Sequence, residues 1–149
     1  MIPREVPMSS ESRMMAGILF LVLPTVMYGG VSILRFLVGT PEYLANPLRQ
    51  DLWRAGHAHA GVFLILSLVA LRYVDEAVLS NAAKWFVRAA IPAAAILIPF
   101  AFFFSVLSAD ATQPNSLIRI AYVGAVILAA GTVTLGVGLV RTQAGHRGA

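Results

Sequence analysis

Four long apolar runs constrain the fold of this chain more than any other feature of its sequence. They cover approximately residues 14–38, 55–74, 86–107 and 117–140. A helix needs about 20 largely apolar residues to cross the hydrocarbon core of a bilayer, and each run reaches that length. Because backbone N–H and C=O groups in lipid must be paired within their own segment, such runs are expected to be helical. We therefore predict an all-α integral membrane protein with four transmembrane helices.

The composition supports a lipid environment. Of the 149 residues, 58% are hydrophobic and 12% are charged, whereas about 25% of a typical soluble domain is charged. The first run is too long for the hydrophobic part of a signal peptide, and no A-x-A cleavage pattern follows it, so we expect a retained helix. The connections between runs are short, which predicts a single domain over residues 1–149, folded as an up-down antiparallel four-helix bundle.

The second helix is expected to begin before its apolar run. Asn46 followed by Pro47 is typical of an N-cap and a first helical residue, which extends this helix to residues 47–74. At 1.5 Å per residue it would be roughly 42 Å long, longer than the ~30 Å hydrocarbon core. Its first two turns should therefore lie among the lipid headgroups, and the residues that follow should be shallow.

The basic residues predict the orientation. Cytoplasmic segments of membrane proteins carry an excess of Lys and Arg. On the side of the two termini and the second connection the chain has seven: Arg4, Arg13, Arg72, Lys84, Arg88, Arg141 and Arg147. On the other side it has four: Arg35, Arg49, Arg54 and Arg119. This bias predicts that both termini are cytoplasmic, and we expect the protein in a bacterial cytoplasmic (inner) membrane.

The stretch WRAGHAHAGVFL, residues 53–64, contains the principal candidate site residues, His57 and His59. Residues i and i+2 of a helix point about 200° apart, so on a regular helix the two rings cannot chelate one metal ion. At most one of them should face the interior of the bundle. Three roles are considered for them: interfacial histidines that hydrogen-bond to carbonyls or water, a metal or haem ligand, and a proton-handling or ligand-binding group.

The segment AGHAHAG resembles the ligand-carrying helices of membrane haem proteins. The resemblance implies that His57 or His59 is an axial ligand of haem b; a transition metal is the other cofactor considered. The remaining three spans contain no histidine. A second axial ligand would therefore come from Met27, another protomer or a partner chain, because His146 lies in the tail on the predicted opposite side.

Other polar residues extend this candidate site. Arg54 and Arg35 are expected near the two histidines, where they would form an outer-leaflet site for an anionic headgroup, a haem propionate or a quinone carbonyl. We expect Arg119 to extend to the membrane interface instead. Asp75 and Glu76 are interpreted as a solvated turn beside Arg72.

Small residues around the histidines predict close helix packing. Gly56 and Ala60, four residues apart, form a small-xxx-small pattern that allows a neighbouring backbone to approach. Gly61 extends this small-residue segment. We therefore expect these three residues to contact another helix.

Several functions are disfavoured by what the sequence lacks. It has no cysteine, which excludes disulfides, thiolate metal sites and Fe–S clusters. No acidic residue lies in the middle of a span, which disfavours a proton-driven pump, and no nucleotide-binding or hydrolase motif is present. The net charge of +4 favours contact with anionic lipid rather than nucleic acid.

The sequence therefore predicts a small membrane protein without catalytic machinery of its own. Our first interpretation is an oligomeric or accessory subunit of a membrane complex, with an outer-leaflet His/Arg ligand site. The first alternative is a redox membrane protein that binds haem or a metal through His57 or His59. The second is an oligomeric channel or transporter with the histidines at its outer mouth.

Overall fold

The computed structural model describes residues 7–146 and contains only helices in that range. Four of them are long and apolar enough to cross a membrane, which confirms the predicted number. The long helices are α1 (Ser10–Gly39), α3 (Pro47–Tyr73), α4 (Asn81–Phe104) and α5 (Ile120–His146). The short α2 (Pro41–Leu44) connects α1 to α3, and a 3₁₀ turn, η1 (Ser116–Arg119), leads into α5.

Polar side chains fix where three of the long helices begin. The side chain of Asn46 accepts a hydrogen bond from Arg49 N at the start of α3, as the sequence predicts. Ser9 caps α1 and Ser80 caps α4 in the same manner. Because these caps lie before the apolar runs, α1 and α4 begin four and five residues earlier than predicted (10 against 14, and 81 against 86).

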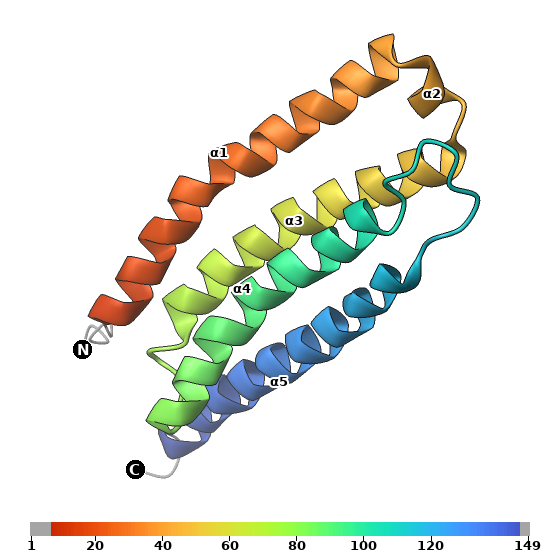
Figure 1. The fold of residues 1–149 in the computed structure, drawn as a ribbon. Coiled ribbons are helices and arrows are strands. Elements are labelled where there is room, and N and C mark those ends of the chain that lie inside the picture. Colours follow the sequence, from red (N-terminus) through yellow and green to blue (C-terminus); the bar gives the residue numbers. More distant parts are fainter. Residues whose placement is uncertain (1–6, 147–149) are drawn as a thin grey trace.

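The long helices lie side by side in the order α1, α3, α4, α5, with α1 and α5 on the outside (Figure 1). Helix α4 packs against both α3 and α5, whereas α1 packs chiefly against α3. Glycines bring α5 close to α4, since a Cβ at Gly124 would lie 2.6 Å from Ile98 Cγ1 and one at Gly131 would lie 3.0 Å from Ala90 Cβ. The main buried cluster joins α3 and α4 through Ala70, Val74, Val87 and Ile91.

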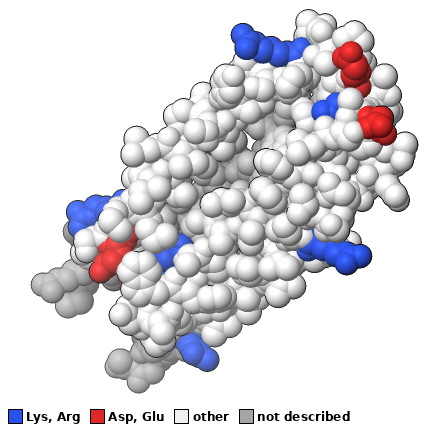
Figure 2. All heavy atoms as spheres, in the orientation of Figure 1, with Lys and Arg blue, Asp and Glu red and all other residues white. Residues whose placement is uncertain are grey.

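Hydrogen bonds between distant segments define the two ends of the molecule. At what we call the Asp75 end, Ser9 N donates to Asp75 Oδ2, and Val78 N donates to Gly138 O. At the opposite end, the Asn46 end, the side chain of Asn46 donates to Ala109 O. Figure 2 shows that charged side chains gather toward these two ends and leave a broad uncharged band between them.

Candidate ligand-binding groove

His59 lies in a groove of about 540 Å³ between α3, α4 and α5. Helices α3 and α5 flank α4 and have little direct contact with each other. A space therefore remains between them on the side of the buried cluster that is nearer the Asn46 end. Helices α3 and α4 contribute His59, Phe63, Leu66, Ile98 and Phe102 to its walls. The remaining wall is formed by η1 and α5 through Ile118, Ala121, Tyr122, Ala125, Leu128, Ala129 and Thr132.

The His59 ring is held by its own helix and by two phenylalanines. Nδ1 lies 2.7 Å from Ala55 O. A carbonyl oxygen can only accept, so Nδ1 is the donor and carries the proton. Phe63 and Phe102 contact the ring edge-on, with centroid distances of 5.3 Å each. The tautomer protonated at Nδ1 has its lone pair on Nε2.

His57 lies on a different side of α3. Its ring packs against α1, where a Cβ at Gly30 would be 2.8 Å from Nε2 and one at Gly29 would be 3.8 Å from Nδ1. This divergence follows from the two-residue spacing. The glycines of α1 thus leave room for one imidazole, while the aromatic groove contains the other.

The arginines predicted for the histidine site lie elsewhere. Arg54 pairs with Asp51 at 3.1 Å, and both side chains are exposed. Arg35 is exposed on α1, as is Met27, which was considered as an axial ligand. Arg119 is also exposed, but it directly follows Ile118 at the end of the groove.

Arg49 contributes to the Asn46 end in a way that the sequence analysis missed. Its guanidinium lies 4.6 Å from the Trp53 ring centroid, and its Nε donates to Val106 O at 3.1 Å. Trp53 also packs against Tyr43 and Phe36, with ring centroids 5.5 Å apart in each case. These contacts join α1, α2, α3 and the segment after α4. The Tyr43 side chain is fully buried, and burial raises the pKa of its phenol.

The predicted packing residues have three different environments. A Cβ at Gly56 would lie 3.0 Å from Phe103, so Gly56 allows close contact between α3 and α4. Ala60 lines a second cavity of about 250 Å³ between α1, α3 and α4, whose walls are entirely apolar. A Cβ at Gly61 would meet no atom within 4 Å. Of the three, Gly56 is the residue in tight helix–helix contact.

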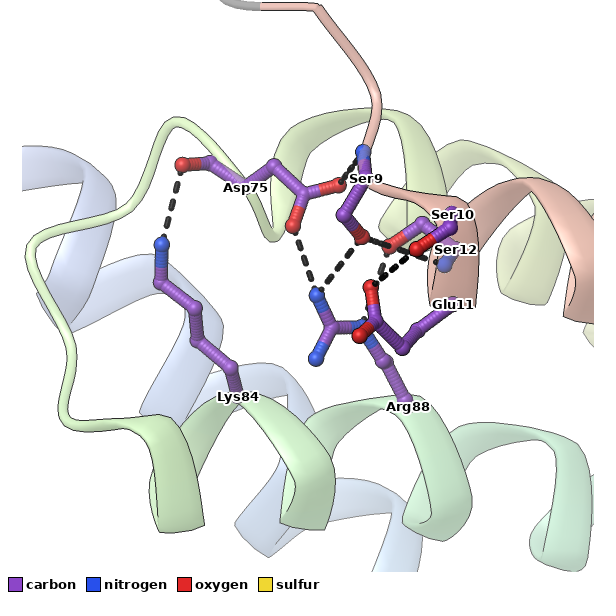
Figure 3. Close-up of polar contacts among 7 residues, drawn as sticks. All are labelled: Ser9, Ser10, Glu11, Ser12, Asp75, Lys84 and Arg88. Atoms are coloured by element: carbon purple, nitrogen blue, oxygen red, sulfur yellow. Dashed lines mark hydrogen bonds and ion pairs between the residues drawn. The ribbon is translucent and has the colours of Figure 1, made fainter.

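The interpretation of Asp75 as a solvated residue is wrong. Its side chain is 9% exposed and accepts a hydrogen bond at 2.6 Å from Arg88, whose side chain is 4% exposed (Figure 3). Arg88 also donates to Ser12 Oγ and Ser9 Oγ, at 3.0 Å each. Glu76, by contrast, does pair with Arg72. The carboxylate of Asp75 is therefore the centre of a buried polar cluster that joins α1 to α4.

The surroundings of Asp75 also determine its protonation. Burial alone raises the pKa of this carboxyl, but hydrogen bonds from Ser9 and Ser12 and the charge of Arg88 outweigh that effect and lower it below 3.8. Lys84 donates to the Asp75 carbonyl at 3.0 Å. Within the described residues, no buried side-chain N or O atom of this cluster lacks a hydrogen-bond partner, so we interpret the cluster as structural.

Comparison with known proteins does not identify a ligand for this groove. No protein family model, curated protein or solved structure matches the chain. Within the described residues, no group of three or more His, Cys, Asp or Glu side chains is placed to hold a metal ion.

Proposed function

We propose that this protein binds a planar apolar cofactor, haem b, in the groove, with His59 as the axial ligand of the iron. The observation that carries this proposal is the hydrogen bond from His59 Nδ1 to Ala55 O at 2.7 Å. Histidines that ligate metals commonly donate their other ring N–H to a carbonyl, which fixes the tautomer and the ring orientation. Phe63 and Phe102 further restrict the ring.

The same hydrogen bond favours haem over a quinone as the ligand of this groove. A quinone carbonyl needs a hydrogen-bond donor, but the neutral His59 ring already uses its N–H on Ala55 O. A free lone pair instead suits a Lewis acid, and haem iron is one that also brings a flat apolar ring.

The shape of the groove supports a flat ligand. Its volume of about 540 Å³ lies within the ~300–1,000 Å³ usual for cofactor sites. Its walls are aliphatic and aromatic apart from His59 and the hydroxyls of Tyr122 and Thr132. Arg119, exposed beside Ile118 at the end of the groove, is the basic residue that we assign to a haem propionate.

We also propose an up-down arrangement in the bacterial cytoplasmic membrane, with both termini cytoplasmic. Support comes from the hydrogen bonds that bring the start of α1, the α3–α4 connection and the end of α5 to the Asp75 end. The excess of basic residues on that side assigns it to the cytoplasm. Of the residues in that excess, Arg4 and Arg147 lie outside the described residues.

The groove changes how we rank the functions expected from the sequence. An oligomeric or accessory role is compatible with haem binding and stays a prediction, since such a subunit can belong to a larger complex. An oligomeric channel or transporter also stays a prediction. The described cavity between α1, α3 and α4 is entirely apolar and the groove contains few polar groups, so neither supports an ion path within one copy of the chain.

The two histidines provide a matched test. The protein is purified from its membrane in mild detergent, titrated with haemin and followed by its absorption spectrum. We expect a saturable Soret band for the wild type and for His57→Ala, and loss of the band for His59→Ala. His59→Gly should regain the band when imidazole is added, which a purely structural role of His59 would not produce. A wild type that binds no haem, or equal bands in both alanine variants, would contradict the proposal.

A further inference from the structure

The second cavity, of about 250 Å³, lies between α1, α3 and α4 and is separate from the His59 groove, with which it shares no lining residue. Its walls hold no side chain that forms hydrogen bonds, so the cavity suits hydrocarbon rather than water. The lining residues are Met15, Ile18, Leu19, Val22 and Val26 on α1, Ala60 and Leu64 on α3, and Pro92, Ala95 and Ile96 on α4.

The cavity opens to the bilayer between α1 and α4. Ile18 and Val22 of α1 are 52% and 41% exposed, and Ile96 of α4 is 69% exposed, although all three line the cavity. This opening follows from the packing of α1, which contacts chiefly α3. Lipid from the surrounding bilayer therefore reaches the cavity from the side.

Contacts between helices bound the cavity at both ends. At the Asp75 end, Arg88 of α4 donates to Ser12 of α1, just before the first lining residue of α1. Toward the middle of the membrane, the His57 ring lies against Gly30, one turn beyond the last lining residue of α1. The cavity thus extends from the Asp75 end to the middle of α1.

The length of the cavity matches one leaflet of a bilayer. Its lining residues on α1 run from Met15 to Val26, which is about 16 Å along a helix at 1.5 Å per residue. One leaflet contributes half of the ~30 Å hydrocarbon core, or roughly 15 Å. The volume of the cavity is also below the ~300–1,000 Å³ usual for cofactor sites, so an extended chain fits better than a ring system.

The charges at the Asp75 end suit the phosphate of a lipid headgroup. Trp85, 43% exposed, precedes Pro92 by seven residues and so lies on the face of α4 that lines the cavity. Tryptophan side chains are enriched at the level of the headgroups, so a lipid with its headgroup beside Trp85 would direct its chain along the cavity. Basic residues exceed acidic ones among the described residues of this end, with Arg13, Arg72, Lys84, Arg88 and Arg141 against Glu11, Asp75 and Glu76.

We propose that this cavity binds an acyl chain of a phospholipid from the leaflet at the Asp75 end. The chain gives the aliphatic walls dispersion contacts along their length. It also fills the space between α1 and α4, so the bound lipid stabilises α1 in its place beside α3.

The first test measures the lipid that the protein retains after extensive washing in mild detergent. We expect the wild type to keep phospholipid at a stoichiometric level, measured by phosphorus analysis and native mass spectrometry. Ala95→Phe fills the cavity and should weaken lipid binding at least about tenfold, which corresponds to ~1.4 kcal/mol. Ala130→Phe adds the same ring at an exposed position of α5, outside the cavity and the groove, and should retain lipid like the wild type.

The second test adds dioleoyl phosphatidylglycerol to delipidated protein in the same detergent. A ligand that binds only the folded state stabilises that state. The added lipid should therefore raise the unfolding temperature of the wild type and of Ala130→Phe, but not that of Ala95→Phe. If Ala95→Phe fails to fold, Ala60→Leu, which narrows the cavity from α3, takes its place.

Equal retention of phospholipid by Ala95→Phe and Ala130→Phe would overturn the proposal. A wild type that loses all its phosphorus on washing and is not stabilised by added lipid would also overturn it. So would a dimer that persists without phospholipid and is dissociated by Ala95→Phe, because a second copy of the chain would then occupy the cavity. None of these measurements depends on haem, so each outcome leaves the proposed function of the His59 groove as it stands.

Discussion

At the residue scale, neutralising Asp75 should cause the largest loss of stability at the Asp75 end. Asp75→Asn leaves the Arg88 guanidinium, 4% exposed, without its counter-charge, and breaking a buried pair in this way costs about 3–5 kcal/mol. The matched control is Glu76→Gln, because the Arg72–Glu76 pair at the same end is 43% and 30% exposed and should contribute less than about 1 kcal/mol. Thermal unfolding in detergent measures both. Equal shifts in the two variants would contradict the buried-pair interpretation.

The same carboxylate predicts how stability depends on pH. The pKa of Asp75 is lowered from 3.8 in the folded protein, so its contribution is fully present above the unfolded value and is lost as pH falls through the folded one. We expect the unfolding temperature to lose this contribution only below about pH 3.8. Asp75→Asn should lack this component of the acid-induced fall. A loss that begins near pH 6 in the wild type and persists in Asp75→Asn would contradict the assignment.

Some residue-level features follow from the sequence and others depend on distant packing. The divergence of His57 and His59 is predictable, because it needs only the helical period. Which ring faces a groove depends on where α1 and α4 lie, and the sequence of α3 does not contain that information. Asp75 was misassigned for the same reason: its partner Arg88 is 13 residues away on α4, and Ser9 is 66 residues away on the approach to α1.

At the element scale, contact between α3 and α4 depends on Gly56. A side chain at this position would meet Phe103 at 3.0 Å and Phe102 Cβ at 3.3 Å, so Gly56→Leu should destabilise the protein by about 1–3 kcal/mol through overpacking. Gly61→Leu, on the same helix where a Cβ meets nothing within 4 Å, should be neutral or slightly stabilising. Thermal unfolding and size-exclusion chromatography compare the pair. Similar behaviour of the two variants would remove the packing role of Gly56.

Helix α1 makes side-chain contacts near both of its ends and in the part between them. Ser9 and Ser12 contact the Asp75–Arg88 pair at one end, and Phe36 packs on Trp53 at the other. Between them, the His57 ring contacts Gly30. The apolar cavity between α1, α3 and α4 lies along this helix. Prediction from apolar runs located α1 but not these contacts, because each joins residues that are distant in sequence, as Ser12 and Arg88 are.

At the scale of the whole molecule, the number of helices was predictable and their packing was not. Apolar length alone determines that four segments can span a bilayer. The helices form a row in which α1 contacts α3 and does not pack against α5. This arrangement depends on where glycines and cavities lie on each helix. The groove at His59 results from that row, because α3 and α5 would have to meet to fill it. The candidate site therefore could be located to a helix, but not to a face, from the sequence.

The absence of cysteine from the chain makes its membrane topology directly testable. Gln113→Cys introduces a thiol at the Asn46 end and Asn81→Cys introduces one at the Asp75 end, both at exposed positions. If the Asp75 end is cytoplasmic, as the basic residues predict, a membrane-impermeant maleimide should label Gln113→Cys in intact cells. Asn81→Cys should be labelled only after the membrane is permeabilised. The cysteine-free parent controls for background labelling, and denatured samples confirm that both thiols can react. The reverse pattern would invert the protein in the membrane and place the His59 groove nearer the cytoplasm, whereas labelling of both positions in intact cells would contradict a single orientation.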